Sequence, residues 1–174
     1  VPCHGTFLFG PPTADGSDLF VVGERDSDIL LFCLDSETGL VRWEQLLASA
    51  GRGINLDVAR KSWTAPVSVR GSLVVCPTTT GWVTAVDRVS RQIVWSTRLQ
   101  ERNDTEELTE SSFDIRNQQI NIDGRWIPSQ PLLVGDRILI AAQEFPDEHS
   151  EHAAELICLD AVTGKKLWAV PKTS

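Results

Sequence analysis

The chain has 174 residues, of which 41% are hydrophobic, and its formal net charge is -8 at pH 7. This acidic balance lacks the clustered Lys and Arg residues that a nucleic-acid-binding surface needs, so we expect no nucleic-acid partner. No apolar run approaches the roughly 20 residues of a membrane-spanning helix, so we expect no membrane insertion by this segment.

The N-terminal part of the chain predicts a series of short strands. An apolar run at residues 7 to 9 is interpreted as a strand of a neighbouring unit. After Pro12, apolar runs predict strands near Leu19 to Gly23 and Ile29 to Leu34, with a polar turn at Glu24 to Asp28 between them.

A D-x-x-T-G sequence follows these strands and leads into a last strand, which we expect to end near Trp43. An Asp side chain accepts hydrogen bonds from nearby backbone N–H groups, and a Thr hydroxyl does so more weakly. Glycine supplies the positive φ that a tight turn requires. Asp35, Thr38 and Gly39 therefore predict a hairpin turn.

This arrangement occurs three times in the chain. LFCLDSETGLVRW ends at Trp43, VTAVDRVSRQIVW ends at Trp95, and LICLDAVTGKKLW ends at Trp168. In each copy a proline also stands seven residues before an apolar strand begins. Internal repeats with periods of about 20 to 50 residues are typical of propellers and solenoids. Each tryptophan follows an aspartate by eight residues, and these aspartates are Asp35, Asp87 and Asp160.

The copies differ from one another at a turn and at two insertions. In the second copy, Ser90-Arg91 replaces Thr-Gly, so either Arg91 is left-handed, at about 1 to 2 kcal/mol, or the turn has another shape. Residues 100 to 125 are first acidic and then alternating, and Asp123-Gly124 indicates a hairpin, so we expect a β-excursion. A smaller acidic insertion occupies residues 144 to 155.

The strand runs are richer in apolar residues than a half-exposed sheet, which indicates sheets covered on both faces. Four short strands per copy, stacked face to face, predict an all-β fold: a partial β-propeller of about three four-stranded antiparallel blades with Trp-docking motifs. We expect one domain over residues 1–174, with blades at about 12–47, 63–99 and 126–172 and an insertion at 100–125. We also expect the chain to be part of a longer protein.

The repeated tryptophan has a mechanical interpretation. A large ring at one fixed position per blade can wedge against the next blade, where it buries about 150 to 250 Å². We therefore assign a structural blade-docking role to the tryptophans and to the residues of the turns: Trp43, Trp95, Trp168, Asp35, Asp87, Asp160, Gly39 and Gly164.

The repeat resembles the quinoprotein-type, or PQQ-like, β-propeller family, whose blades carry the pattern Ala-x-Asp-x-x-Thr-Gly-x-x-x-Trp. The third copy matches with Cys158 in place of Ala, and the second keeps Ala85 but lacks Thr-Gly. The resemblance implies that the Trp docks one blade on the next. The compartment is not determined by the residues, and the resemblance alone favours the periplasm or cell envelope.

Family propellers have seven or eight blades, so the resemblance implies that three blades form an arc with apolar end faces. We expect this arc to self-associate through its exposed blade faces. The alternative is a ring closed by two or more copies of the arc.

No residues are assigned to catalysis, to a cofactor or to a metal. The cysteines are interpreted as small buried side chains rather than as disulfide or metal ligands. The acidic stretch from Glu144 to His152, with His149, could ligate a divalent ion, but it is interpreted as a solvated loop. The four cysteines are Cys3, Cys33, Cys76 and Cys158.

The leading functional hypothesis is a non-catalytic segment that serves as a protein-interaction or scaffold module. Its loops and the insertion at 100–125 would contact an unidentified protein partner. One alternative is part of a quinone-dependent dehydrogenase whose active site lies in absent blades. A second alternative is a sensor ectodomain of a membrane kinase.

Overall fold

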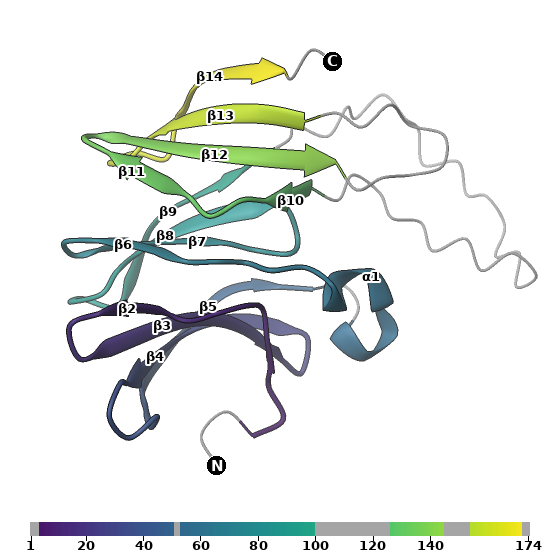
Figure 1. Ribbon diagram of the computed structural model, residues 1–174, viewed down its shortest axis with the longest axis vertical. Helices are drawn as coiled ribbons and strands as arrows, with labels where there is room; N and C mark the ends of the chain where they lie inside the picture. The colour runs from purple at the N-terminus through teal and green to yellow at the C-terminus, as the bar shows by residue number, and fades with distance from the viewer. Residues whose placement is uncertain (1–3, 51–52, 100–125, 145–153, 172–174) are drawn as a thin grey trace, which may run out of the picture.

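The computed structural model describes residues 4–50, 53–99, 126–144 and 154–171. In this part of the chain almost all regular structure is β, and it forms three antiparallel sheets. The sheets are stacked one on the next in chain order, so the first and third blades lie at opposite ends of the stack (Figure 1). The structure is therefore an all-β partial propeller, as predicted.

The first blade contains a strand that the sequence assigned to another unit. β1 pairs with β3 in register Phe7↔Glu24 and Leu8↔Gly23, so the apolar run at residues 7 to 9 belongs to the first sheet. β2 pairs with the other half of β3, so β1 and β2 together form one interrupted inner strand. The strands are β1 (Phe7–Leu8), β2 (Thr13–Asp15), β3 (Asp18–Arg25), β4 (Asp28–Asp35) and β5 (Val41–Ser49).

The second and third blades repeat this order. The inner strand of the third blade is again divided, because β10 and β11 both pair with β12. The second blade consists of β6 (Ser68–Arg70), β7 (Leu73–Pro77), β8 (Trp82–Asp87) and β9 (Gln92–Arg98). The third consists of β10 (Trp126–Pro128), β11 (Leu132–Val134), β12 (Arg137–Glu144), β13 (Ala154–Asp160) and β14 (Lys166–Pro171).

A short helical connection links the first blade to the second. It consists of the 3-10 helix η1 (Ile54–Leu56) and the single turn α1 (Val58–Lys61), which lie beside the junction between the two blades (Figure 1). No helix in the described part of the chain is long and apolar enough to span a bilayer.

Two details of the predicted strands were wrong. Glu24 lies within β3 and is buried, whereas the sequence placed it in a polar turn; the turn itself is the two-residue pair Asp26-Ser27, both with positive φ. Trp43 lies near the beginning of the outer strand β5 rather than at its end. The tight Asp35 turn allows β5 to begin soon after Gly39, so the strand continues past the tryptophan.

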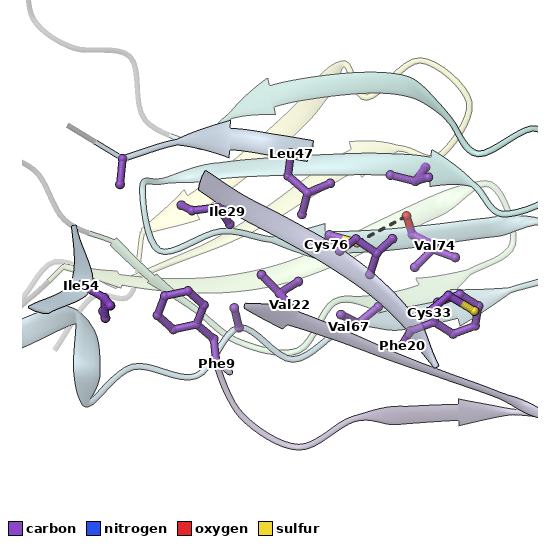
Figure 2. Close-up of a cluster of buried hydrophobic side chains, with 14 residues drawn as sticks. Phe9, Phe20, Val22, Ile29, Cys33, Leu47, Ile54, Val67, Val74 and Cys76 are labelled. Carbon is purple, nitrogen blue, oxygen red and sulfur yellow. Dashed lines mark hydrogen bonds between the residues drawn. The ribbon is translucent and has the colours of Figure 1, made fainter. Parts of the chain in front are cut away.

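Two of the described cores lie between blades, because successive residues of a strand point to opposite faces, and a smaller cluster of Val21, Leu30 and Phe32 lies on the other face of the first blade. In β7, Val74 and Cys76 join the core shared with the first blade, whereas Val75 joins the core shared with the third. This double use explains why the strands are continuously apolar. Figure 2 shows the first of these cores, with Phe20 and Val22 gathered in one cluster with the side chains of the second blade.

The described cysteines pack as small apolar groups. Cys33, Cys76 and Cys158 are buried and free. The Cys76 thiol lies 3.9 Å from the carbonyl oxygen of Val74, a contact drawn as a dashed line in Figure 2. Burial raises the pKa of the Cys33 thiol to about 11, and it also raises that of Cys76, so both thiols stay protonated at neutral pH.

Candidate interaction surfaces of the blades

The three aspartate turns have nearly the same geometry. Asp35 Oδ1 accepts hydrogen bonds from the backbone nitrogen of Thr38 at 2.8 Å and from its hydroxyl at 2.9 Å. Asp160 Oδ1 binds the same two groups of Thr163, each at 2.8 Å. These carboxylates are therefore used to form the turns.

The second turn keeps this shape despite its different sequence. Asp87 Oδ1 accepts hydrogen bonds from the nitrogen of Ser90 at 2.7 Å and from its hydroxyl at 3.0 Å. Arg91 has φ 60°, close to the 68° of Gly39 and the 70° of Gly164. Of the two alternatives drawn from the sequence, the left-handed Arg91 is therefore the one present.

The turn contacts lower the pKa of all three carboxyl groups. The Arg42 guanidinium lowers the pKa of Asp35, the backbone N–H of Ser90 lowers that of Asp87, and the Thr163 hydroxyl lowers that of Asp160. Each contact favours the ionised carboxylate. These groups remain charged at neutral pH, so none is suited to donate or accept a catalytic proton there.

These lowered pKa values predict a loss of stability in acid. Because each carboxyl pKa is lower in the folded chain than in the unfolded one, the stabilisation is complete above the unfolded value, about 3.9, and is lost as the pH falls below it. We expect the melting temperature to fall steeply below about pH 4. Melting followed by circular dichroism should show a smaller acid-induced fall in melting temperature for Asp160→Asn than for the wild-type chain. The control Asp136→Asn should fall as far as the wild type. Equal falls for Asp160→Asn and the wild type would show that the Asp160 turn does not contribute to the loss of stability in acid.

Trp95 packs across the interface between the second and third blades. Its side chain is 8% exposed, and its Nε1 donates a hydrogen bond to the carbonyl oxygen of Ala161 at 3.0 Å. The ring lies so close to the third turn that a Cβ on Gly164 would be 2.5 Å from Trp95 Cδ2. The Thr97 hydroxyl also donates to the carbonyl oxygen of Gly164, at 2.7 Å. Glycine is therefore needed at position 164 for contact as well as for conformation.

A matched pair of substitutions separates these two requirements. Gly39 and Gly164 share the same φ, so Gly39→Ala and Gly164→Ala both incur the left-handed penalty of about 1 to 2 kcal/mol. Only Gly164→Ala also overlaps Trp95, because no atom lies within 4 Å of a Cβ built on Gly39. We expect Gly164→Ala to lose about 1 to 3 kcal/mol more in urea unfolding. Equal losses would show that the indole contact is unimportant.

The equivalent tryptophans of the first and third blades, Trp43 and Trp168, have surroundings that differ from those of Trp95. Trp43 is half-buried, packs against the first core, and has its ring centroid 6.0 Å from that of Phe20. The turn position equivalent to Gly164 in the second blade is Arg91. Trp168, in the third blade, is 44% exposed. The same sequence position thus ranges from buried to open to solvent.

Hydroxyl groups on the inner strands also join neighbouring blades. The Thr13 hydroxyl donates to the carbonyl oxygen of Val67 at 2.7 Å, and the Ser68 hydroxyl donates to that of Pro131 at 2.5 Å. Each donor is the first residue of its inner strand, and each acceptor is the residue just before the next inner strand. Leu132 occupies the donor position in the third blade. The sequence analysis missed these links, although the strand registers make the positions equivalent.

A second inner-strand position shows the same change from polar to apolar. Asp15 of the first blade forms an ion pair with Arg88 of the second, and Arg70 donates to the carbonyl oxygen of Gly135 in the third at 2.5 Å. The equivalent residue of the third blade is Val134, which is 51% exposed.

A buried ionic cluster fastens the helical connection to the first two blades. Arg60 binds Glu24 at 2.5 Å and Asp57 at 2.9 Å, and the three side chains are at most 5% exposed. Arg60 also donates to the Thr79 hydroxyl at 3.4 Å, and Glu24 accepts from the backbone nitrogen of Ile54 at 2.6 Å. The sequence analysis missed this cluster; the Asp57-x-x-Arg60 spacing was its only local signal.

The acidic stretch with His149 and His152 and the insertion at 100–125 lie outside the described residues. Within those residues, no group of three or more His, Cys, Asp or Glu side chains could hold a metal ion.

Comparison with known proteins identifies the family. The family model of the outer membrane protein assembly factor BamB matches residues 5–119 and, in a second match, residues 79–174. The chain belongs to this family of PQQ-like repeat proteins. A comparison with curated protein sequences found no match.

Two solved dehydrogenase structures share the fold of this PQQ-like chain. A europium-containing methanol dehydrogenase aligns with a TM-score of 0.65 at 13% identity, over 96% of this chain and 26% of its own. The quinohemoprotein alcohol dehydrogenase of Comamonas testosteroni gives 0.58 at 13% identity, over 99% and 22%. BamB of Moraxella catarrhalis gives 0.40 at 16% identity, over 94% and 61%. The chain thus spans about a quarter of the length of the dehydrogenases that it matches.

Proposed function

We propose that this PQQ-like chain is a non-catalytic propeller segment that serves as a protein-interaction or scaffold module. The observation that carries the proposal is the apolar surface of the third blade. Large exposed apolar patches on soluble proteins mark sites of interaction with other proteins. Between 42% and 59% of each of the following side chains is exposed there: Leu132, Val134, Leu156, Trp168 and Val170.

The repeated residues of the blades support this proposal because they have structural uses. The aspartates form turns, and Trp95 packs across a blade interface. We propose that Trp43, Trp95 and Trp168 all hold their blade to the next one, with their turns as the matching surfaces. The family is named after an outer membrane protein assembly factor, and a role in assembly is consistent with the proposal.

The alternative, part of a quinone-dependent dehydrogenase, places the active site in absent blades, because the described residues offer no calcium site. A calcium ion beside the quinone requires about six to eight oxygen ligands. Asp35, Asp87 and Asp160 are used by their turns, and Glu24 and Asp57 bind Arg60. The carboxylates of the described blades therefore do not form a calcium cage.

Deletion of the insertion tests the proposed role. Chemical cross-linking of the 174-residue chain in cells of its source, followed by mass spectrometry, should recover a discrete partner. We expect a variant lacking residues 100–125 to lose that partner, and a control lacking residues 145–153 to keep it. If the partner is still cross-linked to both deletion variants, the insertion at 100–125 has no role in binding it.

A second measurement tests the proposal against catalysis. We expect the purified chain, mixed with pyrroloquinoline quinone and Ca²⁺, to neither bind the quinone nor reduce a redox dye in the presence of alcohols. Tight quinone binding with dye reduction would overturn the non-catalytic proposal.

A further inference from the structure

The aspartate turns of the second and third blades differ in polarity from the aspartate turn of the first. Two residues after the aspartate, the first blade has Glu37, whereas the other two have Val89 and Val162. These valines are 78% and 71% exposed at the tips of their turns. Their side chains are not needed to form the turns, because only their backbone nitrogens bind the aspartates.

The same two turns present cations that form no ion pair with any described residue. Arg91 stands where the first and third blades have glycine, and Lys165 and Lys166 follow the glycine of the third turn. All three side chains are exposed. By contrast, the cation next to the first turn, Arg42, forms ion pairs with two carboxylates, one of which is that of Asp35. The later turns thus leave positive charge open to a partner.

Arg91 is kept in a backbone conformation that arginine rarely adopts. Its φ of 60° lies in the left-handed region, which is unfavourable for a residue with a Cβ and harmless for glycine. The turn itself does not need the guanidinium, because its hydrogen bonds come from Asp87, Ser90 and the backbone. Residues held in such conformations gather at functional sites. We therefore expect the Arg91 side chain to be used by a partner outside the chain.

The two turns lie on one surface, because the third turn packs against the strand that leaves the second turn. That strand is β9, and its Trp95 donates a hydrogen bond to Ala161 of the third turn. Arg91 and Trp95 are four residues apart, or about 13 Å along a strand. Val94 lies between them and is 48% exposed. We call this region the turn surface, and it comprises Val89, Arg91, Val94, Val162, Lys165 and Lys166.

The turn surface belongs to the middle blade and to the junction beside it. The second blade shares one core with the first blade and another with the third. In the third blade Lys166 pairs in register with Leu159, whose side chain lies in the core shared with the second blade. Paired residues of neighbouring strands share one face of a sheet, so Lys166 is on the side of the second blade. The turn surface is therefore separate from the outward faces of the first and third blades.

Building on the proposed interaction role, we infer that the turn surface binds an extended acidic segment of a partner protein. Carboxylates of the segment pair with Arg91 and with the two lysines, and apolar side chains between these carboxylates pack on the valines. An arginine binds a carboxylate through two parallel hydrogen bonds, which fixes the position of the segment. An extended chain of about five residues spans the distance from Arg91 to the third turn.

The charge of the chain favours a peptide over an anionic membrane. The formal net charge is -8, so most of the molecule repels an acidic segment, and only a region of unpaired cations attracts it. A lipid surface would bring many more anionic groups against the rest of the acidic chain. The exposed apolar residues of the turn surface are also short valines, whereas segments that bind at a membrane interface insert Trp, Phe or Leu.

Selection from a phage-displayed library of random peptides, with the purified 174-residue chain as the target, tests this inference. We expect the selected peptides to contain more than one Asp or Glu, with apolar residues between them. Fluorescence anisotropy of a selected and labelled peptide then gives its dissociation constant. Arg91→Gly and Val162→Glu should each raise this constant at least about fivefold, because the first removes the arginine and the second adds a repelling carboxylate.

Both variants are chosen so that the chain still folds. Each introduces a residue that the first blade already has at the equivalent position, namely Gly39 or Glu37. Arg91→Gly should raise the melting temperature by about 2 to 4 °C, because it removes the left-handed arginine. Arg98→Gln is the matched control, since Arg98 is an exposed cation at the other end of β9. This control should leave the dissociation constant unchanged.

Three results would overturn the inference: selected peptides without acidic residues, acidic peptides that bind both variants as tightly as the wild type, or binding to phosphatidylglycerol vesicles and to no acidic peptide. If the partner recovered by cross-linking in cells still cross-links to both variants, the turn surface is not its binding site, although the interaction role remains. If the wild-type chain has no partner in cells, the interaction role fails and this inference fails with it.

Discussion

Replacing Trp95 with alanine is expected to lower the free energy of unfolding by about 3 to 5 kcal/mol. The ring is buried between the second and third blades and packs on the backbone of Gly164, so its removal leaves a cavity at an interface rather than at a surface. The substitution also removes the only described hydrogen bond to the Ala161 carbonyl from a side chain. Urea unfolding followed by circular dichroism measures the change.

Trp82→Ala is the matched control for this prediction. Trp82 is 37% exposed at the start of β8, so less of its surface leaves water on folding. We expect its loss to be less than half that of Trp95→Ala. Similar losses for the two variants would mean that the Trp95 contact adds little beyond the burial of an aromatic side chain.

Replacing Arg60 with methionine is expected to lower the free energy of unfolding by about 3 to 5 kcal/mol. The substitution removes the positive charge that lies between two carboxylates, each no more than 5% exposed. A carboxylate that stays buried without this cation retains its desolvation penalty. Urea unfolding at pH 7 measures the loss.

Two further variants show whether this loss arises from the buried ion pairs. Arg25→Met breaks an ion pair with Glu44 whose side chains are 35% and 40% exposed, and we expect it to lose less than about 1 kcal/mol. Adding Glu24→Gln to Arg60→Met should recover part of the loss, because one of the buried charges is then absent. A double variant no more stable than Arg60→Met alone would contradict the electrostatic explanation.

The Trp95 and Arg60 substitutions weaken different connections within the fold. Trp95 joins two sheets directly, whereas the Arg60 cluster joins the helical connection to the first two blades. Both uses are structural, in keeping with a chain whose described polar groups hold blades in place. An interaction surface benefits from such rigidity, because residues held in one arrangement lose less conformational entropy on binding.

The sequence by itself determined the repeat, the all-β fold, the stacked sheets and the aspartate turns. These features depend on residues close together in the chain, such as the Asp35, Thr38 and Gly39 group, whose hydrogen bonds span two or three residues. The continuous apolar strands also indicated burial on both faces, because that pattern arises within a single strand.

Only the tertiary structure decided which of these similar residues have a neighbour. Glu24 meets Arg60 across 36 residues, so no local pattern distinguished it from a solvated turn residue. Gly39 and Gly164 share the same turn sequence and conformation, yet Trp95 packs against Gly164 and no atom lies close to the Cβ position of Gly39. Local sequence specifies the shape of a turn, but contact depends on the blade that is stacked against it, and that blade comes from another part of the sequence.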